Sequence, residues 1–380
     1  MANTLYIHVP FCDGKCHYCG FYSVVAAPGI IALYSGLPAC ELDLLLATVP
    51  GLTRDPLQTV YIGGGTPAML GAEGLKRMAE SLAERLAFDR VAEWTVELNP
   101  ASVTPDLLKT LATLGVNRIS IGIQSFDDAT LSRIGRRHDA KTALRSIRMA
   151  QDAGFDNTGI DLIAGLPGVS TELWLATIER AATLGLKHLS VYALSLEPGT
   201  TLAAQVSSGL KLPDDEAQLK ALSQAESLLG QAGFLRYEIS NYAQPGFECQ
   251  HNLSVWRGND YLGLGPAAAS RIGRSRWTNS EDLAEYIEAL TRKQPLHCTR
   301  EMLSQMDDAV ERAIFALRLS EGIAPYDDAQ RFPALKHCAE TWENRLAGLA
   351  DQGITERGGR RWRLTARGRE VCDAVLRELV

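Results

Sequence analysis

The sequence predicts an α/β fold: a partial (βα)6 barrel of the TIM type, a mixed α+β extension, and a helical C-terminal region. Three observations predict it. Six short runs of β-forming residues alternate with amphipathic stretches over roughly the first half of the chain, an order typical of parallel sheets with helical crossovers. A loop with unusual residues follows each run, at the strand ends where such folds place their sites. The first of these loops holds three closely spaced cysteines.

The predicted strands are Leu5–Val9, Thr59–Ile62, Trp94–Leu98, Arg118–Ile123, Gly159–Ile163 and His188–Leu194. Between them, apolar residues recur at helical spacing. The predicted helices include Leu75–Arg90, Pro105–Leu114 and Ala140–Ala153. Crossovers of one hand bend such a sheet into a barrel or leave it open and doubly wound.

The alternating pattern stops near residue 200. A helical segment (Asp214–Ala232), a Tyr/Asn/Gly-rich stretch (237–265) and a helical region from about Ser280 follow. We therefore expect a barrel over 1–200, an extension covering its mouth over 201–290, and a helical domain over 291–380. An arginine-rich patch around Trp362 precedes a final amphipathic helix, which suggests a winged-helix-like unit. A solvated hairpin face explains the patch better than nucleic-acid binding.

Composition limits the class of protein. Of the 380 residues, 46% are hydrophobic and 22% charged, as in soluble globular proteins. We find no run of eighteen apolar residues and no basic segment leading into an apolar one, so we expect no membrane span, no secretion signal and a cytoplasmic location. The net charge of −7 argues against a nucleic-acid partner.

Cys12, Cys16 and Cys19 form a C-x3-C-x2-C cluster. Three thiolates can hold a [4Fe–4S] cube, which needs four ligands. The next cysteine, Cys40, lies in a predicted helix, so one iron lacks a protein ligand, and an open metal position marks a reactive site. The alternatives are a Cys3His zinc site, with His8 or His17, and free thiols. The spacing differs from the paired C-x2-C knuckles of structural zinc.

The other loops carry groups suited to a polar ligand. Gly63–Gly65 follows the second strand; bare backbone there allows a ligand to approach and its N–H groups to hold an anion. The run is not a G-x-G-x-x-G dinucleotide fingerprint, and a tight strand–helix turn is the alternative. Glu97 and Asp161 lie in predicted buried strands, where a carboxylate is costly unless paired.

The cysteine motif, with an aromatic residue before its last cysteine, resembles the signature of the radical S-adenosylmethionine (SAM) superfamily. The wider sequence resembles the oxygen-independent coproporphyrinogen III oxidase-like group, and within it the heme chaperones more than the oxidase. The matching segments are IHVPFCDGKCHYCGFYS, YIGGGTPAML, VELNP, GIQSFDDATLSRIGRRHDA, IDLIAGLPG and EISNYAQPGFECQHNLSVWRGNDYLGLGP. The match weakens beyond about residue 270.

This resemblance implies that Cys12, Cys16 and Cys19 hold a [4Fe–4S] cluster whose open iron chelates SAM. The residues implied to contact SAM are Tyr6, Tyr18, Gly64, Gly65, Thr66, Glu97, Gln124, Arg136 and Asp161. Two alternatives stay open at this point. Arg136 could belong to a solvated run of charges, and Tyr6 and Tyr18 could be core aromatics.

The resemblance also implies heme binding. His251, in the sequence HNLSVW, resembles the histidine of an H-N-x-x-Y-W motif tied to heme in the chaperone branch. Imidazole is a usual axial ligand of heme iron. Val255 stands where that motif has tyrosine, and Ala267–Ser270 where relatives often carry a histidine-containing run. A hydrogen-bonded structural histidine is the alternative.

The expected function is therefore heme binding and heme transfer to acceptors such as respiratory hemoproteins, with [4Fe–4S], SAM and heme as cofactors. The alternatives are an oxygen-independent coproporphyrinogen III oxidase or another radical SAM enzyme, so enzymatic turnover stays open. Gly20 and Phe21 follow Cys19, where the oxidase has a fourth cysteine, and the oxidase's segment before the cluster has no counterpart ahead of Leu5. Homodimer formation and peripheral membrane contact are left open.

Overall fold

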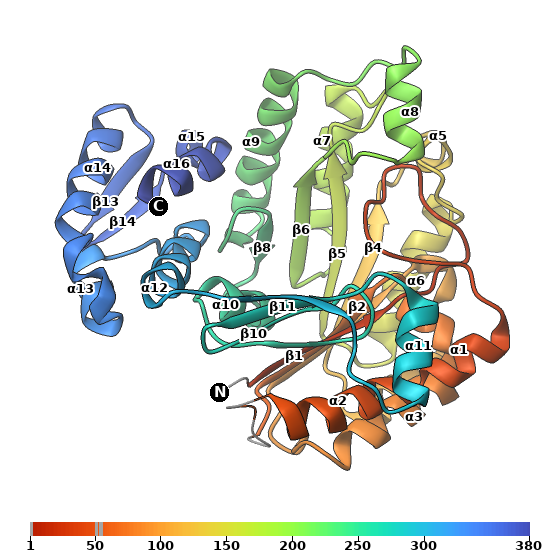
Figure 1. Cartoon of the computed structure of the whole chain (residues 1–380). Helices are drawn as coiled ribbons and strands as arrows, with labels where there is room; N and C mark the ends of the chain where they lie inside the picture. The colour runs from red at the N-terminus through yellow and green to blue at the C-terminus, as the bar shows by residue number, and fades with distance from the viewer. Residues whose placement is uncertain (1–2, 50–51, 53–55) are drawn as a thin grey trace.

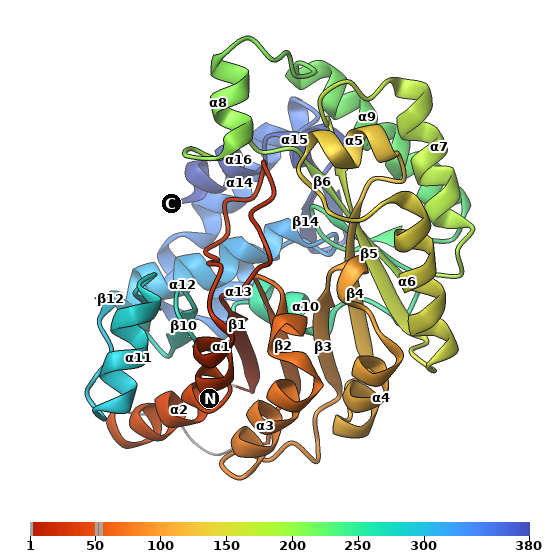
Figure 2. The same cartoon turned by 90° about the vertical axis from the view of Figure 1, so that its right-hand side faces the viewer.

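The computed structural model describes residues 3–49, 52 and 56–380. Its centre is a nine-stranded sheet in the order β7-β8-β6-β5-β4-β3-β2-β1-β9. The six middle strands are parallel and stand side by side in chain order, with helices over their outer face (Figure 2). They are β1 (Thr4–Val9), β2 (Thr59–Gly64), β3 (Glu93–Leu98), β4 (Arg118–Gln124), β5 (Asn157–Ala164) and β6 (His188–Ala193). The predicted partial (βα)6 barrel is confirmed.

The helices of the barrel follow the predicted crossovers. They are α1 (Pro28–Tyr34), α2 (Leu37–Thr48), α3 (Gly71–Ala83), α4 (Pro105–Leu114), α5 (Asp128–Arg133), α6 (Ala140–Asp152), α7 (Thr171–Ala182), α8 (Thr201–Ser207) and α9 (Asp215–Gln231), with short 3-10 turns at Pro67–Leu70 and Pro100–Ser102. Helix α4 has the predicted bounds. Helix α3 ends seven residues before the predicted Arg90. Beyond its end Leu86 is buried in the main core, and Phe88 packs against Trp94 at 5.0 Å between ring centroids.

Residues of the six strands alternate between two environments, apart from a register shift in β4. Their apolar residues pack in the main core, as Ile119, Ile121 and Ile123 do, each 0% exposed. The intervening residues face the lumen of the barrel. They include Tyr6, Tyr61, Glu93, Thr95, Glu97, Arg118, Ser120, Asp161, His188 and Ser190. Barrels of this type usually fill their interior with branched apolar side chains, whereas this lumen is polar.

The extension closes the sheet at both edges. Strands β7 (Leu235–Arg236) and β8 (Asn241–Ala243) add antiparallel to β6, and β9 (Leu262–Leu264) pairs parallel with β1. Between them lies α10 (Gln250–Trp256). A separate antiparallel sheet follows, with α11 (Leu283–Thr291) after its second strand; its strands are β10 (Ala269–Ile272), β11 (Ser275–Asn279) and β12 (Cys298–Met302). The predicted division at residues 200 and 290 stays a prediction.

The C-terminal region has its own hydrophobic core, around Trp342 and Leu346, and lies to one side of the barrel beyond α9 (Figure 1). Its elements are α12 (Gln305–Ile314), two 3-10 turns (Phe315–Arg318, Pro333–His337), α13 (Pro325–Arg331), α14 (Ala339–Asp351), the hairpin β13 (Thr355–Gly358) and β14 (Arg361–Leu364), α15 (Ala366–Glu370) and α16 (Cys372–Leu379). Helices followed by a hairpin agree with the winged-helix-like expectation. Each arginine of the patch contacts a carboxylate or a backbone carbonyl.

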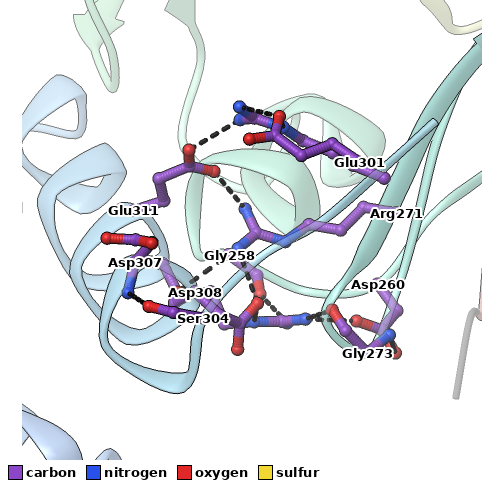
Figure 3. Close-up of polar contacts among 11 residues, drawn as sticks. Gly258, Asp260, Arg271, Gly273, Glu301, Ser304, Asp307, Asp308 and Glu311 are labelled. Carbon is purple, nitrogen blue, oxygen red and sulfur yellow. Dashed lines mark hydrogen bonds and ion pairs between the residues drawn. The ribbon is translucent and has the colours of Figure 1, made fainter. Parts of the chain in front are cut away.

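A network of ion pairs joins this C-terminal unit to the extension (Figure 3). Arg271 on β10 contacts Asp308 at 2.7 Å and Glu311 at 3.2 Å, both on α12. Arg312 of α12 contacts Asp308 at 2.9 Å and reaches back to Asp260 at 2.7 Å. The side chains of Arg271 and Arg312 are only 4% and 11% exposed, so these pairs are screened little by solvent.

One apolar stretch among the described residues, 28–48, is long and hydrophobic enough by length and composition to cross a membrane, with a mean hydropathy of 1.6. The sequence prediction overlooked it because Glu41 and Asp43 interrupt the apolar run. The stretch forms two helices, α1 and α2. Glu41 is fully buried and accepts hydrogen bonds from Gly265 N–H (2.8 Å), Asn279 Nδ2 (2.6 Å) and Tyr286 O–H (2.7 Å).

Candidate functional site

The three cysteines lie in the loop between β1 and α1, which is fastened at several points. Cys12 N–H donates to Val24 O at 3.1 Å and so closes the loop on itself. His17 N–H donates to Ile134 O at 3.0 Å, and the His17 ring Nδ1 lies 2.9 Å from Arg133 O. These bonds hold the loop over the carboxyl ends of the strands.

The surroundings of the three cysteines bear on the zinc alternative. Among the described residues, no three His, Cys, Asp or Glu side chains converge to hold one metal ion. A cube offers a separate iron to each thiolate, whereas zinc draws its ligands onto one atom. Both ring nitrogens of His8 have partners, Tyr6 O–H at 3.1 Å and Tyr22 O at 2.9 Å, which argues against His8 as a zinc ligand. All eight cysteines are free, and Cys40 is exposed.

A cavity of about 590 Å³ opens at this end of the barrel. It is lined by the three cysteines and by most residues predicted to bind SAM: Tyr18, Gly64, Gly65, Thr66, Glu97, Gln124, Arg136 and Asp161. Two predicted residues do not line it. Tyr6 lies below it, where its hydroxyl contacts His8, and His251 lies at the far end of β2, beside Thr59.

The glycine run at the end of β2 is required by the protein's own packing. A Cβ on Gly63 would lie 2.6 Å from Glu97 Oε2, and one on Gly65 would lie 2.6 Å from Phe11 O. Gly64 has φ +102°, where L side chains are strained. A backbone hydrogen bond ties this turn to the loop that carries the cysteines: Thr66 N–H donates to Phe11 O at 2.7 Å. The glycines therefore form a tight turn, and Gly64 and Gly65 also form part of the cavity wall.

Glu97 enters the cavity from the end of β3 and is held by neutral donors. Tyr61 O–H donates to its Oε1 at 2.7 Å and Gly64 N–H to its Oε2 at 3.2 Å. Burial raises the pKa of Glu97 to about 7, although both hydrogen bonds act in the opposite direction. Near neutral pH this carboxyl therefore exchanges readily between its two protonation states, and a cationic ligand would favour the ionised one.

Asp161 and Arg136 line the same cavity. Burial raises the pKa of Asp161, against a hydrogen bond from Ser190. Arg136 Nη1 lies 3.5 Å from Cys16 Sγ and Nη2 lies 3.1 Å from Asn99 Oδ1; Nη2 also contacts Gly122 O. Arg136 is thus fixed beside Cys16 and is not part of a solvated run of charges.

The cavity fits the cluster and SAM on observations of this chain. The side-chain oxygen of Gln124 and Nε of Arg136 are buried with no partner in the described part of the chain, and both residues line the cavity. Gln124 also has φ +69° beside a register shift in β4, and such strain gathers at ligand sites. Carboxylates at Glu97 and Asp161 suit an amino group or ribose hydroxyls, and Arg136 suits a carboxylate.

His251 is buried in the floor of the lumen. It is 7% exposed, its Nδ1 lies 3.2 Å from Thr59 Oγ1, and its ring packs on Tyr61 at 5.0 Å between centroids. Burial, and then the charge of Arg118, lower the pKa of His251 to about 3, so the imidazole is neutral. Neutral imidazole is the form that binds iron, but in this conformation the ring faces protein.

Helix α10, which carries His251, is held from both sides. On the barrel side Glu93 accepts from Gln250 N–H at 2.9 Å and His251 N–H at 3.0 Å. On the side of the C-terminal unit, the Trp256 ring packs edge-on against Phe315, and the Arg318 guanidinium lies 4.6 Å above Trp256. Access of a large ligand to His251 therefore requires α10 to move.

Three residues of the site escaped the sequence analysis. Tyr61 holds Glu97, and its place two residues before Gly63 on the same face was the available signal. Asn99 donates to Thr66 Oγ1 at 2.8 Å and accepts from Arg136, so it links two walls. His138 lines the cavity; burial, and then the charge of Arg136, lower its pKa to about 4. No local pattern distinguishes His138 from a surface residue in its charged surroundings.

Comparison with known proteins agrees with this geometry. The family model described as the radical SAM superfamily matches residues 6–193. The heme chaperone HemW of Lactococcus lactis subsp. lactis is 30% identical over 381 residues, covering all of this chain and 97% of the relative. HemW of Mycobacterium tuberculosis is 35% identical over 378 residues, covering 99% and 94%.

A solved structure extends the likeness to the whole fold. Coproporphyrinogen III oxidase (HemN) of Escherichia coli, described as a radical SAM enzyme, superposes with a TM-score of 0.83 at 26% identity, covering 99% of this chain and 89% of the other. The cluster loop, the cavity and the full-length match lead to one assignment. The chain belongs to the HemW family of radical SAM proteins.

Proposed function

We propose that this protein is a cytoplasmic heme chaperone: it binds heme, holds a SAM-ligated [4Fe–4S] cluster, and passes heme to acceptor proteins such as respiratory hemoproteins. The observation that carries the proposal is the full-length match to proteins named heme chaperone HemW, which includes the extension and the C-terminal unit as well as the barrel. Nucleic acid is not among the proposed partners, since the chain carries a net charge of −7 and its arginine patch is occupied by internal contacts.

In this proposal Cys12, Cys16 and Cys19 hold the cluster. When bound, a reduced [4Fe–4S] cluster and SAM supply one-electron chemistry. The chain's own residues position the cofactor and keep water out. Arg136 offers a bidentate cation to the SAM carboxylate.

The other residues that line the cavity contact the rest of the SAM molecule in this proposal. Glu97 and Asp161 accept hydrogen bonds from its amino group or ribose hydroxyls, with Gln124, Gly64, Gly65 and Thr66 beside them. Tyr18 packs over the cluster side, and Tyr6 supports the site from below.

Heme ligation through His251 is part of the proposal and includes a conformational step. The imidazole is neutral and therefore able to bind iron, but α10 must leave the floor of the lumen before heme can reach it. Val255, which replaces the tyrosine of the related motif, is half-buried on the same helix. Homodimer formation and peripheral membrane contact stay predictions from the sequence.

Coproporphyrinogen oxidation is the second candidate, because the structural match to HemN covers 99% of this chain. One local feature speaks against it. Phe21 occupies the position of the oxidase's fourth cysteine, lines the cavity and is 69% exposed. A side chain that cannot ligate metal thus stands next to the cluster site.

The test is heme loading followed by transfer. Anaerobically reconstituted protein is titrated with heme, and the loaded form is mixed with heme-free respiratory membranes. We expect a stable heme absorbance spectrum and restored oxidase activity in the membranes. The variant His251→Ala is expected to bind heme more weakly while it keeps its cluster absorbance. Absence of transfer from the loaded wild-type protein would overturn the proposal, and unchanged heme affinity in His251→Ala would make that residue structural.

A further inference from the structure

Arg118 is a buried cation in the lumen of the barrel. It begins the inward face of β4, below Ser120 and Gln124, and is 2% exposed. Its Nη1 donates to Thr95 Oγ1 at 3.4 Å, and its buried Nε has no partner in the described part of the chain. Within the same residues it makes no ion pair with a carboxylate at 4.0 Å or less. A guanidinium is always protonated in proteins, so an uncompensated charge here would be very costly.

Three carboxylates that do not touch Arg118 balance its charge. Glu93 and Glu97 lie two residues on either side of Thr95 on β3, and two residues span roughly 7 Å along a strand. Asp161 on β5 is reached through Ser120, whose hydroxyl lies 3.4 Å from its Oδ1. The carboxylates themselves accept hydrogen bonds from neutral donors: Tyr61 O–H donates to Glu97, and His251 N–H donates to Glu93. Arg118 therefore sits among three buried acidic groups and touches none of them.

We propose that Arg118 is a positioning residue for SAM: from the lumen below the cavity, its charge keeps Glu97 and Asp161 in the carboxylate form that accepts hydrogen bonds from the cofactor. Arg136, which contacts Cys16 and Asn99 at the cavity wall, also opposes the effect of burial on Asp161. The charge of Arg118 opposes the effect of burial on both carboxyls. At such distances in a protein interior, one charge changes a carboxyl's ionisation constant by roughly tenfold or more.

Other titratable groups also face Arg118. They are Tyr61, Glu93, His188, Tyr237, Cys249 and His251. Burial makes neutral forms of these tyrosines, histidines and Cys249 favourable. The substitutions leave all six side chains in place. Loss of the Arg118 charge also acts on His188 and His251, but none of the six lines the cavity, so the SAM affinity reports on Glu97 and Asp161.

The test measures SAM affinity by anaerobic equilibrium dialysis of cluster-loaded protein between pH 6.5 and 8.5. We expect Arg118→Gln to weaken SAM binding at least about tenfold at pH 6.5, with the loss shrinking towards pH 8.5 as the carboxyls ionise. Arg118→Lys keeps the charge and is expected to stay within about threefold of wild type. Arg145→Gln, which removes an exposed arginine of α6, is the matched control. Unchanged affinity in Arg118→Gln, or a loss that is independent of pH and persists in Arg118→Lys, would overturn the proposal.

A second measurement does not depend on the cofactor. In cluster-free protein at pH 8.5, Arg118→Gln is expected to lower the thermal midpoint less in a Glu97→Gln background than in the wild-type background, because the unbalanced carboxylate is then absent. Equal decreases in both backgrounds would show that the two residues are not coupled and would overturn the proposal. Neither measurement uses heme, so failure of the heme-chaperone proposal would leave these results unaffected, and the converse also holds.

Discussion

Replacing Glu41 with glutamine should remove a pH dependence from the stability of the protein. Glu41 is fully buried on α2, where it joins the barrel to the extension through Gly265, Asn279 and Tyr286. Burial raises its pKa from 4.5 to about 7, although all three hydrogen bonds act in the opposite direction. The folded state therefore binds this proton more tightly than the unfolded state does.

The sign and size of the effect follow from that difference. Stability from protonated Glu41 is fully present below pH 4.5, is lost as the pH rises through 7, and stays constant above that range. A pKa difference of one corresponds to about 1.4 kcal/mol, so ionisation of Glu41 costs the folded state about 3 kcal/mol. Glutamine has a similar shape and no charge at any pH, so Glu41→Gln does not incur this cost.

The assay is urea unfolding of the cluster-free, reduced protein, followed by circular dichroism from pH 5 to pH 8. For each protein, the unfolding free energy at pH 5 is subtracted from that at pH 8, and these differences are compared. Any loss of stability that is the same at both pH values, such as that from a lost hydrogen bond, therefore cancels. We expect the wild-type protein to lose about 2 to 3 kcal/mol more than Glu41→Gln over this range. Glu80→Gln, at an exposed position of α3, controls for the loss of one acidic group. Parallel curves for wild type and Glu41→Gln would refute the reasoning.

Two further predictions concern the cluster and helix α10. Cys16→Ala is expected to abolish the iron–sulfur absorbance, whereas Cys40→Ala, at an exposed position, is expected to retain it; an intact cluster in Cys16→Ala would contradict the ligand assignment. Arg312→Gln removes a cation that contacts Asp308 and Gly258 O, and loss of a partly buried pair costs roughly 2 to 4 kcal/mol. We therefore expect Arg312→Gln to speed both amide hydrogen exchange in α10 (residues 250–256) and heme uptake. Unchanged exchange in α10 would show that the C-terminal unit does not restrain this helix.

The order of strands and the composition of the cavity were accessible from the sequence because they depend on local patterns. Runs of β-forming residues placed the six strands to within two residues of their observed starts, and their loops met at one end as parallel strands require. The polar lumen is also visible in the alternation of LYIHV (5–9), where tyrosine and histidine stand between Leu5, Ile7 and Val9.

Long-range contacts account for what the sequence could not supply. His251 contacts Thr59, 192 residues away, and Glu41 contacts Asn279, 238 residues away. No periodicity predicts such pairs. The burial of His251 depends on α10 packing between the barrel and the C-terminal unit, and the membership of β9 in the main sheet depends on its pairing with β1. Both arise only when the chain closes on itself.

In our proposal the cluster and SAM site serves heme handling rather than porphyrinogen decarboxylation. The most direct test is one anaerobic assay of reconstituted protein with dithionite and SAM, run with coproporphyrinogen III and separately with heme. We expect about four irons per chain, stable heme binding and no decarboxylated porphyrin. Decarboxylated product would contradict this proposal and would identify the protein as a coproporphyrinogen III oxidase.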